Sequence, residues 1–567
     1  MINIKLVVSL FHCFSIMLVC SQRIISTSYG DLEGKTINGD QHMFKNIPFA
    51  KPPVGKLRFT LPKWPDSWKN VRNAKEYGLA CLSNNARSKV FGSPPMSEDC
   101  LYLNVFTNEH CLVSKNCSTL IYYHGGGIIS GSAIQFNDTF ILERYVKNDI
   151  VFIIPAYRLG VFGLLFFGDD NLVPHNLAIH DCEHALRFIH QEISHFGGHQ
   201  DDINLIGHSA GGHISMIFGF SRPPPNYDMP ELLIKNCYEL AQRIGCYEPN
   251  ITSDHEIVDC LRQKNGHDLV AVQRIMEDDL LFFWNFLAGE PFMHLGDSIA
   301  DFKKNAVKRD MMIGNTENEN GRLPYRYKNP AISGSFMDFE NPYEVACRFD
   351  EYYDSAPNGT VYESFTQGIF VSVATYAQAD VNAGAKVYLF QSNQKPSNHV
   401  SDLQYFVGAH SEKYHTSDMD IMDTFYSEMI VNFTKYGEPS PVWEPLDPAK
   451  MNYYALEVNT EKGIWPKMEE GFHESDVNFW FINMTAFDRE VTRQKQLSNT
   501  TVLPRYPMYP GPVILPKNNE SASFSVSFQW WFYLLIVVVT LIIFYLIYVL
   551  KRKFLKRPVD ETTPLFK

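Results

Sequence analysis

The feature that most restricts the fold of this 567-residue chain is a strand that runs directly into a glycine-rich turn. The apolar run Ile203–Ile206 has the length and character of a buried strand. It is followed at once by Gly207-His208-Ser209-Ala210-Gly211, a G-x-S-x-G sequence. Such a turn between a strand and a helix presents the serine at its tip. The same five residues also suit a purely structural Gly-Ser turn, so their context decides between the two interpretations.

The surrounding chain alternates between strand-like and helix-like segments. The residues Ala185, Leu186, Phe188, Ile189 and Ile193 form the apolar stripe of a helix. The expected strands are Leu120–Tyr123, Ile150–Ile154, Ile203–Ile206, Met311–Ile313 and Val387–Gln391, and a long helix is expected over Asp418–Tyr436. This alternation predicts an α/β fold, with a mostly parallel, twisted central sheet and helices on both of its faces.

Composition excludes several classes of protein. The chain is 45% hydrophobic and 20% charged, which is typical of a globular protein and not of a disordered or collagen-like one. Its formal net charge of −13 argues against nucleic acid as a partner, because that partner requires a basic surface. The sequence contains no metal-binding or cofactor-binding motif, and it leaves the oligomeric state undefined.

Both ends of the chain resemble targeting segments. Residues 1–21 form a signal peptide in this interpretation, since an apolar run follows Lys5 and small residues precede the expected cleavage; an uncleaved anchor is the alternative. Residues 530–550 are 21 residues without a charge, enough to cross a bilayer as a helix, although a buried core helix is the alternative. Residues 495–529 are expected to form a stalk and residues 551–567 a tail.

The predicted topology is that of a single-pass type I membrane protein. Basic residues follow the apolar run at once, which places the tail in the cytosol and residues 22–529 outside the cell or in a lumen. Either the plasma membrane or a lysosome-related compartment suits this topology. Residues 561–566 resemble an acidic dileucine sorting signal with Phe in the second apolar position, although an ordinary solvated tail is the favoured alternative. Candidate N-glycosylation sites, all between signal and span, are Asn116, Asn137, Asn250, Asn358, Asn432, Asn483, Asn499 and Asn519.

A second glycine-rich turn precedes the serine. His124-Gly125-Gly126-Gly127 follows the strand Leu120–Tyr123, and glycines allow backbone N–H groups to approach a ligand closely. A flexible turn is the simpler explanation. Because the run lies directly after a strand and upstream of a G-x-S-x-G turn, an oxyanion-binding loop is the better interpretation.

With these motifs in order, the chain resembles the type B carboxylesterases, in the carboxylesterase and cholinesterase branch of the α/β-hydrolases. Matching segments are Glu98–Val105, Tyr157–Gly163 and Phe196–Gly198, and the resemblance extends over about residues 25 to 485. It implies one α/β-hydrolase domain over residues 22–494. The overall layout is similar to that of membrane-anchored nematode carboxylesterase-like proteins.

The resemblance implies a catalytic triad of serine, acid and histidine in that chain order. Ser209 takes the position of the nucleophile. Glu319 matches the acid in the run Ile313–Gly321, with Glu317 as the alternative if the register slips. His399 opens a segment whose spacing to Asp, Leu, Tyr and Gly matches that of the family, unlike the nearby His410 and His415.

The resemblance also implies roles for backbone groups and cysteines. Gly126, Gly127 and Ala210 would donate N–H bonds to the oxyanion. Of the 11 cysteines, the family pattern pairs Cys81 with Cys100 and Cys246 with Cys260. A small loop between Cys111 and Cys117 is a further plausible pair. Cys182, Cys237 and Cys347 have no assigned partner.

The chain departs from the family pattern at three places. His208 precedes the nucleophile where the family usually has Glu, and the loop between Cys81 and Cys100 contains no Trp for a quaternary ammonium group. Both departures argue against a cholinesterase. Roughly twenty residues of the expected layout, including a strand, are absent after the helix that follows Ser209. Either the sheet is shortened or the coding sequence has lost a segment.

Three functions suit these observations. The preferred one is a membrane-anchored serine carboxylic-ester hydrolase that forms an acyl-enzyme and acts on small neutral or anionic esters. The second keeps the triad but transfers the acyl group to a glycoside or another alcohol. The third is a catalytically weak adhesion protein of neuroligin type, which the candidate triad and the short tail make less attractive.

Overall fold

The computed structural model describes residues 22–497, apart from 84–93, 220–229, 250, 280, 282, 284–285, 294–298, 320–336, 338, 358–359 and 410–414. The signal peptide, stalk, span and tail predicted from the sequence lie outside this part of the chain. Among the described residues, no helix combines the length and the apolar character that crossing a membrane requires.

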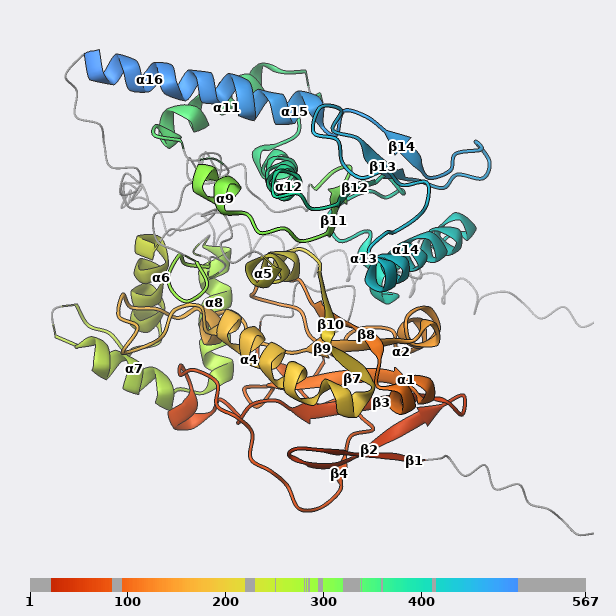
Figure 1. The fold of residues 1–567 in the computed structure, drawn as a ribbon. Coiled ribbons are helices and arrows are strands. Elements are labelled where there is room, and N and C mark those ends of the chain that lie inside the picture. Colours follow the sequence, from red (N-terminus) through yellow and green to blue (C-terminus); the bar gives the residue numbers. More distant parts are fainter. Residues whose placement is uncertain are drawn as a thin grey trace, which may run out of the picture. The chain divides into compact units, whose positions relative to one another are not determined.

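The strands form two main sheets that lie one after the other in the molecule (Figure 1). The larger sheet has eight strands: β1 (Gln22–Thr27), β2 (Gly30–Ile37), β3 (Gln41–Pro48), β4 (Arg72–Asn73), β7 (Tyr102–Asn108), β8 (Cys117–Tyr123), β9 (Ile150–Pro155) and β10 (Gly198–Gly207). The smaller sheet has four: β11 (Met311–Thr316), β12 (Val387–Ser392), β13 (Tyr453–Leu456) and β14 (Lys467–Glu469). β5 (Ala80–Cys81) and β6 (Met96–Ser97) form a separate short pair.

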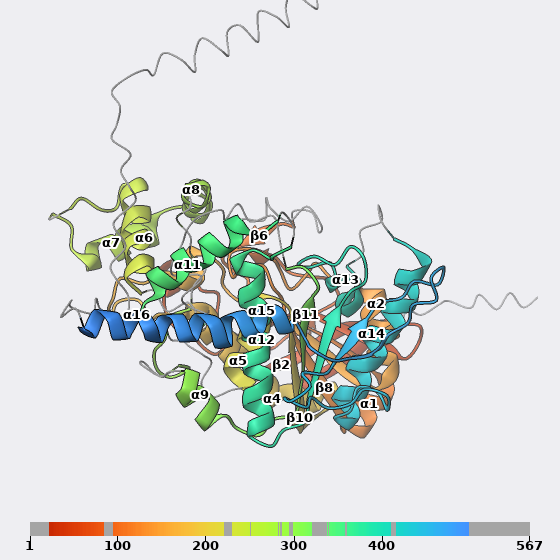
Figure 2. The same cartoon turned by 90° about the horizontal axis from the view of Figure 1, so that it is seen from above.

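Helices cover both faces of the sheets, as predicted (Figure 2). α4, α5 and α12 pack on one side of the strands, and α2 and α14 on the other. The helices are α1 (Glu109–Ser114), α2 (Asp138–Arg144), α3 (Val161–Leu164), α4 (Leu177–Glu192), α5 (Ala210–Gly219), α6 (Pro230–Arg243), α7 (Asp254–Gln263), α8 (Gly266–Asp278), α9 (Ile299–Asn305), α11 (Pro342–Ser355), α12 (Ser364–Asn382), α13 (Leu403–Val407), α14 (Ser417–Tyr436), α15 (Glu474–Asn478) and α16 (Thr485–Leu497).

Local sequence explains where several of these elements begin and lie. Every residue of β8 and β9 is buried, as expected of strands that are covered on both faces. The side chain of Thr416 caps α14 by accepting a hydrogen bond from the N–H of Met419. Ser253 and Glu256 form a capping box at the start of α7. These caps fix the residues at which the two helices begin.

The prediction of one mostly parallel sheet is wrong in two respects. In the larger sheet, β1, β2, β3, β7 and β9 pair antiparallel in succession, whereas β9, β8 and β10 pair in parallel, as does the short β4 with β2. Short connections join β1 to β2 and β2 to β3, and they favour antiparallel pairing of these three strands because parallel strands need longer crossovers. The sheet is also interrupted: among the described residues, β10 pairs with β8 and β11 pairs with β12, but β10 and β11 do not pair with each other.

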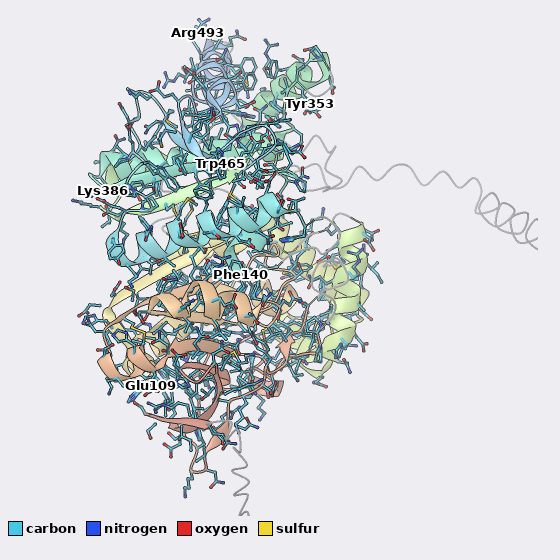
Figure 3. All side chains as sticks on the ribbon, turned by 90° about the vertical axis from the view of Figure 1, so that its right-hand side faces the viewer. Glu109, Phe140, Tyr353, Lys386, Trp465 and Arg493 are labelled. Carbon is cyan, nitrogen blue, oxygen red and sulfur yellow. A yellow bond between two sulfur atoms is a disulfide. The ribbon has the colours of Figure 1, made fainter. Side chains whose placement is uncertain are left out.

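The interruption lies where the sequence lacks the expected segment. α5 ends at Gly219 and the next described element, α6, begins at Pro230. No strand therefore enters between β10 and β11 within the described part of the chain. Figure 3 shows the resulting succession from the side, from Glu109 of α1 past Phe140 of α2 to Lys386 beside β12 and Arg493 of α16.

Three disulfides are formed among the described residues. Cys81 pairs with Cys100 and Cys246 with Cys260, as the family resemblance implies. The plausible third pair, Cys111 with Cys117, is also formed. Cys182 and Cys237 are buried free thiols, and Cys347 is an exposed one.

Candidate active site

Ser209 lies on a strained turn between β10 and α5. Its φ of 56° falls in the left-handed region, which is costly for a residue other than glycine. A Cβ on Gly207 would come within 2.0 Å of the carbonyl oxygen of Gly211, and one on Gly211 within 1.9 Å of that of Tyr123. Only glycine fits at these two positions. The motif is therefore the sharp strand-to-helix turn predicted, and not merely a flexible loop.

The hydroxyl of Ser209 faces a histidine from a distant part of the chain. Ser209 Oγ lies 3.0 Å from Nε2 of His399, which follows β12. His399 Nδ1 in turn makes a short hydrogen bond to the carboxylate of Glu319, which follows β11. Ser209 and His399 are partly exposed, whereas Glu319 is buried. The structure thus joins the three residues that the sequence assigned to the triad.

The loops that carry the acid and the histidine are tied together. Asn318 forms an isolated parallel bridge with Asn398, and the N–H of Asn318 donates to the carbonyl of Ser397. The N–H and hydroxyl of Thr316 both donate to Glu319 Oε1, at 2.7 and 2.9 Å. Glu319 is therefore fixed from one side by the end of its own strand and from the other by His399.

The alternative acid points elsewhere. The carboxylate of Glu317 pairs with Lys395, outside the triad. The register predicted for Glu319 is therefore the one the structure adopts. Of the two histidines that lacked the family spacing, His415 pairs with Asp420, and His410 lies outside the described residues.

The electrostatics of the pair favour a charged imidazole. Burial would lower the pKa of His399, but the hydrogen bond and charge of Glu319, together with the charge of Asp402, raise it above the ordinary value. Burial would likewise raise the pKa of Glu319, yet its bonds to His399 and Thr316 hold that pKa below the usual range. Glu319 is therefore ionised near neutral pH and stabilises the imidazolium that forms when His399 takes a proton.

The predicted oxyanion loop lies beside the nucleophile. Gly126 and Gly127 have φ of 118° and 61°, and with Ala210 they line the cavity that contains Ser209. Ala210 is the first residue of α5, so its N–H has no partner within the helix. Among the backbone hydrogen bonds of the described residues, none uses the N–H of Gly126, Gly127 or Ala210 as donor. All three are available to a ligand.

A buried histidine and tyrosine hold this loop in place. His124 is stacked on Tyr157, with ring centroids 4.4 Å apart, and the Tyr157 hydroxyl donates to the carbonyl of His124 at 2.6 Å. Burial lowers the pKa of His124 to about 4, so it is neutral and serves the loop as a structural residue. The sequence marked the glycines but contained no signal for this stacking.

His208 and Asp402 border the site and contact each other, which the sequence did not predict. His208 Nε2 lies 3.4 Å from Oδ1 of Asp402, and both side chains are largely buried. The ring centroids of His208 and His399 are 5.7 Å apart. The sequence identified His208 as a departure from the family pattern, and Asp402 as part of the histidine motif. Their contact follows from the fold, because α13 begins beside the turn that carries Ser209.

The candidate N-glycosylation sites differ in their exposure to solvent. Asn116, Asn137 and Asn483 are exposed, and Asn432 is half-buried, with its side-chain amide donating to the carbonyl of Pro439. The other four, Asn250, Asn358, Asn499 and Asn519, lie outside the described residues. Glycosylation stays a prediction at all eight.

A strained serine turn, a histidine and a buried glutamate on an α/β scaffold define the class of the α/β-hydrolases. The profile of the carboxylesterase family matches residues 21–480. The chain belongs to the carboxylesterase family.

Individual relatives agree with this assignment. Carboxylesterase 1C of Mus musculus is 30% identical over 529 residues, which cover 81% of this chain and 92% of that protein. Acylcarnitine hydrolase of Mus musculus is 31% identical over 283 residues, 45% of this chain and 49% of that protein. Gut esterase 1 of Caenorhabditis briggsae is 30% identical over 263 residues, which cover 43% of this chain and 44% of that protein. The match thus spans about half the length of the latter two relatives.

The electrostatics predict the pH dependence of catalysis. His399 acts as a base only when it is neutral. Because its pKa is raised, the midpoint of the acidic limb of the kcat/KM profile should lie above about pH 6.5, the ordinary pKa of histidine. Replacing Glu319 by Gln removes the carboxylate that raises this pKa. The limb should move to lower pH, while kcat falls by about 10²- to 10⁴-fold.

Glu317→Gln is the matched control, since that carboxylate belongs to a partly exposed pair with Lys395. Its pH profile and rate should stay within about threefold of the wild type. A profile that shifts in Glu317→Gln but not in Glu319→Gln would contradict the assignment of the acid.

Proposed function

We propose that this protein is a serine carboxylic-ester hydrolase that works through an acyl-enzyme. The observation that carries the proposal is the continuous chain of contacts from Ser209 Oγ through His399 to Glu319. Membership of the carboxylesterase family supports it. An assembled triad also favours an enzyme over the adhesion protein considered from the sequence.

The chemistry follows from the geometry. His399 Nε2 takes the proton of the Ser209 hydroxyl as Oγ attacks the carbonyl carbon of the ester. The carbonyl oxygen becomes an oxyanion, which the N–H groups of Gly126, Gly127 and Ala210 stabilise. His399 then returns the proton to the departing alkoxide, which leaves as an alcohol. Water repeats the cycle on the acyl-enzyme and releases the acid and the free serine.

The charge beside the nucleophile supports neutral or anionic esters as substrates. A Glu in place of His208 would add a negative charge next to Ser209, whereas the imidazole of His208 adds no negative charge there. Two unit charges about 4 Å apart interact by about 4 kcal/mol at an effective dielectric near 20. A cationic substrate therefore gains less here than it would beside a carboxylate.

The membrane anchor is a second part of the proposal. The uncharged run at 530–550 is long enough to span a bilayer, and basic residues follow it directly. The predicted signal peptide supports a catalytic domain outside the cytosol. In this proposal the hydrolase acts on small esters that reach the outer or lumenal face of a membrane.

A fluorophosphonate probe tests the catalytic proposal. The wild-type protein should be labelled at Ser209, and Ser209→Ala should lose both labelling and the hydrolysis of p-nitrophenyl acetate. His399→Ala should lose at least about 10³-fold in kcat, since the triad acts as a unit. His415→Ala, an exposed histidine paired with Asp420, is the matched control and should behave as the wild type. A wild-type protein that takes no probe would refute the proposal.

A substitution at His208 tests the charge argument. The wild type should prefer a neutral thioester over butyrylthiocholine by at least about tenfold in kcat/KM. His208→Glu should narrow this ratio, whereas His208→Gln, which removes the imidazole without adding charge, should leave it nearly unchanged. The idea fails if all three proteins give the same ratio.

Protease protection tests the topology. In sealed microsomes, trypsin should remove an epitope tag placed after Lys567 and leave the catalytic domain intact. Detergent should then make the domain accessible. A tag that survives trypsin without detergent would place the tail on the lumenal side and overturn the predicted orientation.

A further inference from the structure

A cavity of about 1400 Å³ separates the edge strands of the two sheets. It is lined along its length by Ile203–Gly207 of β10 and by Met311–Gly314 of β11. Ser209 follows β10 and Glu319 follows β11, and His399 joins the two, so the carboxyl ends of both strands lie at the same end of the cavity. Asp201 and Arg309, near the amino ends, also line it. The two strands therefore run alongside the cavity in the same direction.

Both strands present an unpaired edge to this space. Among the described residues, β10 is paired only with β8 and β11 only with β12. The consequence is visible in the side chains of β10: Ile203, Leu205 and Ile206 are only partly buried, although every residue of the neighbouring β8 is buried. An edge with this much apolar surface in the middle of a molecule is unusual, since native proteins cover or pair their strand edges.

Orphaned polar atoms line the same cavity. Both carboxylate oxygens of Asp380, on α12, are buried without a hydrogen-bond partner, and Asp380 has no exposed surface on the protein. The hydroxyl of Ser215, on α5, is likewise buried without a partner. Buried polar groups normally have partners, so each unpaired group calls for an explanation. Both groups belong to residues that border the cavity.

We propose that this cavity is an acceptor site for one extended peptide strand that another polypeptide supplies. Such a strand would lie between β10 and β11, parallel to both. Its backbone would satisfy the two open edges, as in recognition by β-strand addition. Because helices cover both faces of the sheets here, its side chains would be apolar on both faces.

The charges of the cavity define one end of the strand. Five carboxylates line it, of which those of Glu319 and Asp402 lie at the end that contains Ser209. The other three are those of Asp201, Asp310 and Asp380, and the guanidinium groups of Arg187 and Arg309 line the cavity as well. Asp310 and Arg309 directly precede β11, so this acidic end lies where a parallel strand would begin. A cationic group at the amino end of the peptide would therefore meet the exposed carboxylates of Asp201 and Asp310.

Two other occupants fit less well. The segment that links α5 to α6 within this chain contains the run Pro223-Pro224-Pro225, and proline has no N–H to donate to a strand edge. An acyl chain would fill the apolar part of the cavity but would leave the backbone groups of both edges without partners. A peptide strand satisfies the apolar and the polar parts together.

Amide hydrogen exchange of the full-length chain in lipid nanodiscs tests the proposal. The probe is the hexapeptide amide Lys-Ile-Val-Val-Ile-Ser. Exchange at Ile203–Gly207 and Met311–Thr316 should slow by at least about tenfold, with half-maximal protection below about 100 μM. Exchange at β1 and β14, the outer edges of the two sheets, should not change. No protection at 1 mM, or equal protection at β1, overturns the proposal.

Variants of the peptide probe distinguish a peptide strand from an acyl chain as the occupant of the cavity. Successive residues of a strand direct their backbone N–H groups to opposite edges. N-methylation of the peptide at positions 2, 4 and 6 therefore blocks one of its edges, and N-methylation at positions 1, 3 and 5 blocks the other. Either set should abolish the protection of β10 and β11 against exchange. Replacing Lys by norleucine should weaken binding at least fivefold in the wild type and not in Asp310→Asn. Decanoate that protects both edges as well as the peptide does would instead identify an acyl-chain channel. The readout needs no esterase activity, so it stands apart from the probe labelling of Ser209.

Discussion

The contact between Ser209 Oγ and His399 Nε2 joins two parts of the molecule that no pairing of strands joins within the described residues. Ser209 belongs to the larger sheet through β10, and His399 and Glu319 belong to the smaller sheet through β12 and β11. No strand pairing joins β10 to β11 within the described residues. The geometry of catalysis therefore depends on how the two sheets are held against each other by side-chain packing and by hydrogen bonds outside the sheets, such as the one that the Tyr145 hydroxyl donates to the carbonyl of Phe406.

That packing involves helices more than strands. α14, which follows β12 in the chain, contacts both β8 and α2. Aromatic residues such as Phe390 of β12 belong to the same apolar core as β8 and β9, whereas Ile313 and Leu389 belong to a separate core on the other face of the smaller sheet. One continuous core thus passes from sheet to sheet on one face, and it aligns the turn at Ser209 with the loops of Glu319 and His399.

Local motifs predicted the site because each one encodes its own geometry. The G-x-S-x-G turn is recognisable because steric limits at Gly207 and Gly211 allow no other residue. His399 was found from its spacing to Asp402 and Gly408, which fixes a loop and the short helix α13. Glu319 was found by register, and the structure separates it from Glu317, which pairs with Lys395.

What the sequence could not predict depends on contacts between distant segments. The contact between His208 and Asp402 joins two motifs that lie far apart in the chain. The antiparallel order of the early strands depends on pairing partners, which the alternation of apolar residues does not specify. The sequence did reveal that a segment is missing after α5, but the division into two sheets follows only when the fold is seen.

Division of the active site between two sheets has a consequence for how this protein responds to heat. Regions of a protein open locally at free energies below that of global unfolding, in units that often coincide with structural motifs. A small separation of the sheets would part Ser209 from His399 while each sheet kept its own hydrogen bonds. Thermal inactivation would then be a reversible event that precedes melting, and cooling would restore the enzyme without any refolding of its strands.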